Sequence, residues 1–137
     1  MITRLTDNFL QQVYNLGIEL HQNFKDLYNF ESLNTEFNET YVYVDNNSVL
    51  GFIHIQSLVD EINIIDIIVD SSMRKKGIGY SLIEHIFNIY PDKRFILEVS
   101  CDNTAALNLY KKLGFVQISV RSKYYNGIDA VVMERKN

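Results

Sequence analysis

The stretch that decides the fold covers residues 62–79 and reads INIIDIIVDSSMRKKGIG. Its first part, Ile62 to Val69, is rich in apolar β-branched residues, which is typical of a buried strand. A polar loop follows, and apolar residues then recur at helical spacing as one stripe made of Ile78, Leu82, Ile83, Ile86 and Phe87. The stretch therefore predicts a strand, a loop and a helix in immediate succession.

A second strand after this helix predicts how the first strand is paired. The helix is delimited by Pro91, the only proline in the chain, and the run Phe95 to Val99 again has strand composition. Two strands joined by a crossover helix lie parallel to each other in one sheet. We therefore expect a ligand crevice at the carboxyl ends of these two strands.

The rest of the chain predicts more strands and helices. Four further runs have strand composition: Tyr41 to Val44, Val49 to Ile55, Phe115 to Val120 and Ala130 to Met133. Polar residues 45–48 predict a hairpin turn between the first two. Helical spacing recurs before Gly114 and over residues 8–33, where we expect one or two amphipathic helices. The whole pattern predicts an α/β (α+β) fold, a mixed sheet covered by helices, in a single domain spanning residues 1–137.

Composition argues against several classes of protein. Hydrophobic residues make up 47% and charged residues 22% of the 137, as in a globular domain, and the net charge of −4 is the wrong sign for binding nucleic acid. No apolar run is long enough for a membrane span. The lone Cys101 is expected to be a small residue at a strand end. The scattered His21, His54 and His85 lack metal spacing and are expected to be structural or surface residues. We expect a cytoplasmic protein without a metal.

The loop between the first strand and its helix combines positive charge with glycine. Arg74, Lys75 and Lys76 precede Gly77 and Gly79. The first amides of a helix have no internal partner and carry the positive end of its dipole, so a backbone that can close in forms a pocket for phosphate oxygens. The spacing differs from that of triphosphatase loops and of the dinucleotide fingerprint. These residues predict a diphosphate site, and the alternative is a solvated basic surface.

Two blocks of this sequence resemble the GNAT superfamily of N-acetyltransferases. Residues 66–70 followed by Arg74 to Gly79 resemble its acetyl-coenzyme A signature, and residues 97–115 resemble its second signature. The resemblance covers roughly residues 61–133. It implies a single-domain GNAT-like fold, with a mixed, mostly antiparallel sheet, a central parallel strand pair and about four flanking helices.

The resemblance also implies acetyl-coenzyme A as the cofactor. In the family, a bulge splays the strand before the loop, so that free main-chain groups, here of Ile67 and Val69, bond the pantetheine arm. The loop holds the pyrophosphate. Asn103 matches an asparagine that contacts the cofactor arm, and Tyr110 matches a tyrosine that faces the thioester sulfur. The implied cofactor-binding residues are Ile67, Ile68, Val69, Arg74, Lys75, Lys76, Gly77, Ile78, Gly79, Asn103 and Tyr110.

Glu98 and Tyr110 are the candidate catalytic pair. Glu98 interrupts an apolar strand, where an unpaired carboxylate is costly to bury, and we expect a general base whose pKa is raised by partial desolvation. The alternative is an edge-facing glutamate paired with a lysine. A phenol with pKa ~10 keeps its proton at neutral pH and can donate it to a thiolate with pKa ~8.5, which suits Tyr110 as the acid. The alternative is an aromatic residue of the core.

The acceptor is expected to be a primary amine. Residues 121–133 resemble the last hairpin of the ribosomal-protein alanine N-acetyltransferase branch, which implies a protein N-terminus as acceptor. An α-amine has pKa ~8, so about a tenth is neutral at pH 7, far more than for lysine. The chain lacks tryptophan and has Ile128 where the branch has glutamate, and residues 23–38 would define the acceptor. A polyamine or amino sugar stays open as the acceptor, and a non-catalytic coenzyme A-binding module stays open as the function. We expect a monomer or homodimer.

Overall fold

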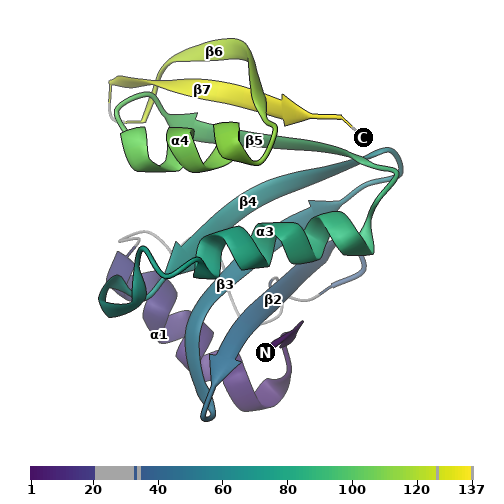
Figure 1. Cartoon of the computed structure of the whole chain (residues 1–137), viewed down its shortest axis with the longest axis vertical. Helices are drawn as coiled ribbons and strands as arrows, with labels where there is room; N and C mark the ends of the chain where they lie inside the picture. The colour runs from purple at the N-terminus through teal and green to yellow at the C-terminus, as the bar shows by residue number, and fades with distance from the viewer. Residues whose placement is uncertain (21–32, 34, 126, 137) are drawn as a thin grey trace.

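A computed structural model describes residues 1–20, 33, 35–125 and 127–136 of the chain. Within these residues, seven strands form one sheet in the order β1-β2-β3-β4-β5-β7-β6, and only the β4–β5 pair is parallel. Helices cover both faces (Figure 1). The elements are β1 (Ile2–Arg4), η1 (Asp7–Phe9), α1 (Leu10–Leu20), β2 (Asn38–Asp45), β3 (Ser48–Ser57), β4 (Glu61–Val69), η2 (Ser71–Met73), α3 (Ile78–Ile89), β5 (Arg94–Ser100), α4 (Thr104–Lys112), β6 (Val116–Tyr125) and β7 (Ile128–Arg135).

The predicted fold class is confirmed. All six predicted strands and the helices α3 and α4 are present, and the two turn residues Asn46 and Asn47 have positive φ angles of 50° and 63°. The short edge strand β1 was not predicted. The described residues contain three α-helices rather than about four; of the helical stretch predicted over residues 8–33, η1 and α1 are observed, and residues 21–32 lie outside the described part. None of the helices in the described part has the length and apolar character to span a bilayer.

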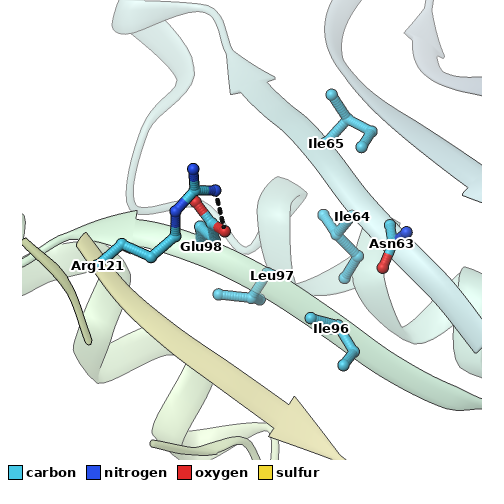
Figure 2. A pocket seen from close by; sticks show the side chains of 7 residues that line it. All are labelled: Asn63, Ile64, Ile65, Ile96, Leu97, Glu98 and Arg121. Carbon is cyan, nitrogen blue, oxygen red and sulfur yellow. Dashed lines mark hydrogen bonds and ion pairs between the residues drawn. The ribbon is translucent and has the colours of Figure 1, made fainter. Parts of the chain in front are cut away.

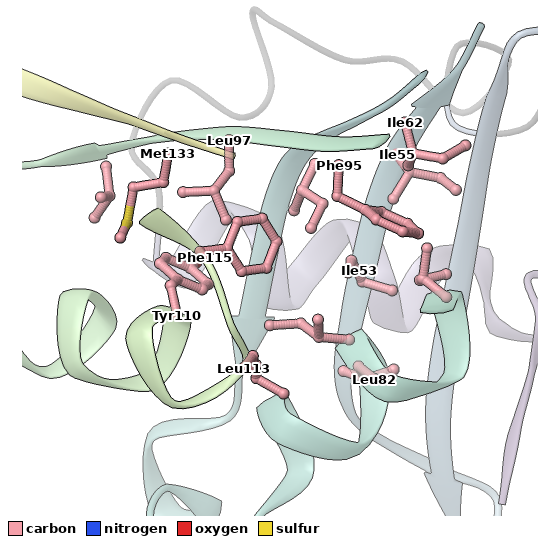
Figure 3. Packing of buried hydrophobic residues seen from close by; sticks show 14 of the residues in the cluster. Ile53, Ile55, Ile62, Leu82, Phe95, Leu97, Tyr110, Leu113, Phe115 and Met133 are labelled. Atoms are coloured by element: carbon pink, nitrogen blue, oxygen red, sulfur yellow. The ribbon is translucent and has the colours of Figure 1, made fainter. Parts of the chain in front are cut away.

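Two apolar cores lie on opposite faces of the sheet. The larger packs α3 and α4 against the strands, and Figure 3 shows Leu82 of α3 and Tyr110 of α4 beneath Phe95 and Leu97 of β5. The smaller packs α1 against β2, β3 and β4, with Val13 and Phe52 fully buried. Each such side chain contributes about 1.5–3 kcal/mol of burial free energy. The two cores hold β4 between helices on both sides, which positions its carboxyl end.

An extra residue in β4 reverses the side-chain alternation of that strand. Its pairing with β3 passes from Ile55↔Ile64 to His54↔Asp66, so Ile65 is a β-bulge. Because side chains alternate along a strand, one inserted residue exchanges the two faces. Even-numbered positions face the α3 core before the bulge and odd-numbered positions face it afterwards, as the members of that core show: Ile62, Ile64, Ile67 and Val69.

His54 is a buried neutral imidazole. It is 1% exposed, its Nδ1 lies 2.9 Å from the Thr40 hydroxyl, and that hydroxyl donates to the carbonyl oxygen of Leu33 at 2.6 Å. The hydroxyl has one hydrogen, so Nδ1 must donate to it. Burial disfavours the imidazolium and lowers the pKa of His54 to about 4. His54 therefore has the structural role predicted from the sequence.

Of the other two histidines, only His85 is among the described residues, and it packs against a tyrosine. His85 lies edge-on to the ring of Tyr41, with 5.4 Å between the centroids. His21 lies outside the described residues. No group of three metal-ligating side chains occurs in the part of the chain that the structure describes.

His54→Asn should flatten the acid dependence of stability. The pKa of histidine is about 6.5 in an unfolded chain, so the stabilisation from neutral His54 is complete above that pH and is lost as pH falls toward about 4. Linkage gives a loss of about 2 kcal/mol between pH 7 and pH 5. Urea unfolding at both pH values should show this loss reduced in His54→Asn, which retains a donor for Thr40. Equal losses in wild type and variant would contradict a buried neutral imidazole.

Candidate active site

The site is an opening between the two parallel strands. The β4–β5 ladder runs from Glu61↔Arg94 only as far as Ile64↔Leu97, so both strands continue beyond their last pair. A cavity of about 330 Å³ lies at this point (Figure 2). Its lining comes from β4, β5 and β6: Asn63, Ile64, Ile65, Ile96, Leu97, Glu98 and Arg121. The opening is at the carboxyl ends of the parallel pair, where the sequence predicted a crevice.

The main chain of β4 presents hydrogen-bonding groups to this opening. The amide of Asp70 donates to the carbonyl oxygen of Leu50 at 2.8 Å, and hydrogen-bonded pairs alternate along an antiparallel ladder. Ile68 therefore turns its amide and carbonyl toward β3, whereas Ile67 and Val69 turn theirs toward β5. The Ile68 side chain is 8% exposed and packs in the core beneath α1. Ile67 and Val69 thus direct main-chain groups away from β3 whereas Ile68 does not, and a cofactor contact of any of the three stays a prediction.

The basic loop leads into an uncapped helix start. Gly77 is the N-cap of the 12-residue helix α3, has φ +81°, and has no neighbouring atom within 4 Å of the position a Cβ would take. The exposed Arg74, Lys75 and Lys76 come directly before it. Among the described residues, no side chain caps the start of α3. These amides and three cations form a concentrated positive site, as predicted for a diphosphate.

Buried contacts fix the position of that helix start relative to the opening. The side chain of Ile78 is 4% exposed in the core between α3 and the sheet. A Cβ at Gly79 would lie 3.7 Å from side-chain atoms of both Ile67 on β4 and Leu109 on α4. The positive helix start is therefore beside the carboxyl end of β4 and next to α4.

Glu98 lies on β5 with its side chain at the cavity. The side chain is 28% exposed, and its Oε1 accepts a hydrogen bond from Nη1 of Arg121 at 2.8 Å (Figure 2). The alternative considered from the sequence was a glutamate paired with a lysine. Glu98 is indeed paired with a cation, but that cation is an arginine of β6 and not a lysine. Arg121 was not singled out in the sequence, although a charged residue within an apolar strand signals that a partner exists.

Tyr110 approaches β5 from the other face. It is 6% exposed on α4 and packs edge-on against Phe115, with 5.8 Å between ring centroids. Leu97 and Val99 share its core, and Figure 3 shows Leu97 and Tyr110 on the same side of β5. Because side chains alternate along a strand, Glu98 points to the opposite face. Tyr110 is not among the residues that line the cavity. Tyr110 is therefore an aromatic residue of the core, as in the alternative considered from the sequence. An acid role for its hydroxyl stays a prediction.

Asn103 and Cys101 lie in the turn after β5. The Asn103 side chain caps α4, because its Oδ1 accepts from the amide of Ala106 at 3.2 Å. This contact fixes the start of α4, and a contact of Asn103 with a cofactor stays a prediction. Cys101 is exposed with a free thiol immediately beyond the strand, at the strand end where it was expected.

The opened parallel strand pair beside a basic, glycine-containing helix start is the arrangement that the resemblance to the GNAT acetyltransferases implied. A statistical model of the Acetyltransferase (GNAT) family matches residues 7–115. The chain therefore belongs to the GNAT family of acetyltransferases.

The sequence relatives of this chain include two proteins named as N-acetyltransferases. Ribosomal protein bS18-alanine N-acetyltransferase of Escherichia coli strain K12 is 34% identical over 88 residues, which are 61% of this chain and 59% of that protein. N-alpha-acetyltransferase RimI of Mycobacterium tuberculosis is 38% identical over 69 residues, 49% of this chain and 44% of that protein. The match thus spans less than two thirds of the length of either relative.

Solved structures extend the similarity to nearly the full chain. The crystal structure of the Escherichia coli ribosomal-protein-S18-alanine N-acetyltransferase has a TM-score of 0.88 and 27% identity, and the match covers 99% of this chain and 92% of that one. An aminoglycoside 6'-N-acetyltransferase complexed with coenzyme A has a TM-score of 0.82 at 17% identity, covering 99% and 96%. The second likeness is one of fold alone.

Proposed function

We propose that residues 1–137 form one acetyl-coenzyme A-dependent N-acetyltransferase domain that transfers an acetyl group directly to a primary amine. The observation that carries the proposal is the opening between β4 and β5, with Glu98 at its cavity and the helix start of α3 beside it. Family membership supports the same chemistry. The single sheet formed by all seven strands supports one domain.

The residues at the opening fit acetyl-coenzyme A. The unbonded amides at the start of α3, the absence of a side chain at Gly77 and the three preceding cations suit a pyrophosphate. The main-chain groups of Ile67 and Val69 suit the amides of a pantetheine arm, because they face away from β3. When bound, the cofactor supplies an acetyl group activated as a thioester.

Glu98 and Tyr110 can divide the proton transfers between two faces of β5. The Glu98 carboxylate lies at the cavity and can accept a proton from an incoming amine, directly or through water. The Tyr110 residue, on the α4 side, can donate its hydroxyl proton to a leaving thiolate, because a phenol keeps its proton at neutral pH. An acid and a base on opposite faces avoid competing for one proton.

The acceptor that we favour is an α-amine at a protein N-terminus. Both sequence relatives are named for acetylation at such an amine, and a carboxylate base suffices for an amine that is already partly neutral at pH 7. Most of the acceptor-defining region, residues 23–32 and 34, lies outside the described residues. The alternatives are a polyamine or amino sugar acceptor and a non-catalytic coenzyme A-binding module. A cytoplasmic location and a monomer or homodimer stay predictions.

An acceptor panel tests this function. The protein is mixed with acetyl-coenzyme A and either peptides with free N-termini, the same peptides with blocked N-termini, or small amines, and thiol release is followed. Faster release with free than with blocked peptides supports an α-amine acceptor, and faster release with small amines reassigns the acceptor. No release above hydrolysis with any acceptor, together with tight coenzyme A binding, would favour the non-catalytic module.

A further inference from the structure

The register of the sheet explains how Arg121 reaches Glu98. The two residues are on β5 and β6, with β7 between them, so their strands are about 10 Å apart. Ala130 of β7 is paired with Ser100 on one side and with Arg121 on the other. A methyl group at this position leaves room for an arginine side chain to cross β7. Arg121 thus lies level with Ser100 across the sheet, and its side chain extends to Glu98, two residues before Ser100 on β5.

Irregular pairing of β6 with β7 places Arg121 on the face of the sheet that carries Glu98. The register between β6 and β7 shifts between Gln117 and Ser119 and again beyond Arg121. Glu98 is paired with Val132, Val132 with Ser119, and side chains of directly paired residues share a face. Arg121, two residues after Ser119 in regular pairing, is therefore on the Glu98 face of the sheet. The guanidinium lies over the cavity wall, with 52% of its side chain exposed.

The ion pair uses one oxygen of the carboxylate and leaves the other available. Nη1 of Arg121 bonds Oε1 of Glu98 at 2.8 Å, and within the described residues no hydrogen bond or ion pair reaches Oε2. A glutamate side chain has three rotatable bonds, so a carboxylate held through one oxygen presents the second in a restricted direction. Ion pairs this exposed contribute little to folding stability, so a purely structural reason for the contact is weak.

We infer that Arg121 is a positioning residue, which holds Glu98 through Oε1 so that Oε2 accepts the proton of the acceptor amine. This inference rests on the proposed function, because it requires Glu98 to be the base. The proton passes from the ammonium or attacking amine nitrogen to Oε2, and Arg121 keeps all of its own protons. A misplacement of about 1 Å at a catalytic group can cost about 100-fold in rate.

The test compares Arg121→Met in two backgrounds. In the otherwise wild-type protein we expect kcat to fall by about 10- to 100-fold, with little change in the KM for the acceptor or in acetyl-coenzyme A affinity measured by calorimetry. Arg121→Lys should recover part of the rate, because lysine retains one charged donor without the planar fork. In the Glu98→Gln background, Arg121→Met should cost no more than about twofold, since the base through which it acts is gone.

Controls separate positioning from charge and folding. Lys112→Met removes an exposed cation from α4 and should leave kcat unchanged. Thermal melting checks each variant, and Arg121→Gln replaces Arg121→Met if the latter melts early. Equal losses in both backgrounds, or a change confined to the acceptor KM, would overturn the inference while the proposed function stands. Absence of turnover by the wild-type protein across the acceptor panel would overturn both.

Discussion

Glu98→Gln is expected to lower kcat for amine acetylation by about 100- to 10,000-fold, the range for loss of a general base. The amide has the shape of the carboxylate but cannot take a proton at neutral pH. The side chain is at the surface of the cavity rather than in the core, and the amide oxygen can still accept from Arg121. Binding of acetyl-coenzyme A and the melting temperature should therefore stay at their wild-type values. Steady-state thiol release at saturating acceptor measures the effect.

Glu84→Gln provides the matched control for this change. Glu84 is an exposed carboxylate on α3, so its replacement removes the same charge without altering the cavity. It should retain wild-type kcat. If Glu98→Gln also retained wild-type kcat, Glu98 would not be the base. If Tyr110→Phe were active as well, both assigned roles would have to be given up.

Gly77→Asp is expected to weaken acetyl-coenzyme A binding by roughly 100-fold. The aspartate would place a carboxylate where the helix start meets the pyrophosphate, and two unit charges 4 Å apart repel by about 1 kcal/mol in water and about 4 kcal/mol at a protein surface. The space around Gly77 is open, so the new side chain fits. Its φ of +81° costs about 1–2 kcal/mol for most residues with a Cβ, and less for aspartate, which tolerates the left-handed region. Calorimetric titration measures the affinity.

Two variants isolate the charge at this position. Gly77→Asn has the same size as aspartate and the same tolerance of a positive φ, without the charge, so it should bind the cofactor much more tightly than Gly77→Asp. Gly127→Asp introduces the same carboxylate at a φ of +85° with equally open space, but at the β6–β7 turn. It should leave cofactor affinity unchanged. Equal weakening by Gly77→Asn and Gly77→Asp would show that backbone strain, not charge, is responsible.

Local sequence was sufficient for the strands, the hairpin and the helix start. Strand composition identified β2 to β7 because apolar β-branched residues are concentrated in short runs, and Asn46 and Asn47 marked a turn because asparagine tolerates positive φ. The edge strand β1 escaped prediction, since three residues carry no periodicity. The loop from Arg74 to Gly79 could be predicted as a diphosphate site because the chemistry of such a site depends on adjacent residues alone.

Only the tertiary structure decided which groups meet at the opening. The sequence named Glu98 as a base, with a lysine-paired glutamate only as the alternative, whereas the observed partner is Arg121, which is 23 residues away and separated from it by an intervening strand. The bulge at Ile65 likewise sets the register in which the main-chain groups of Ile67 and Val69, the two that the family resemblance implied, face away from β3. Both outcomes depend on register, and a shift of one residue exchanges the two faces of a strand without changing its composition. The sequence by itself thus determined the elements, the family signatures and the candidate residues, while pairing across the sheet determined how those residues are arranged.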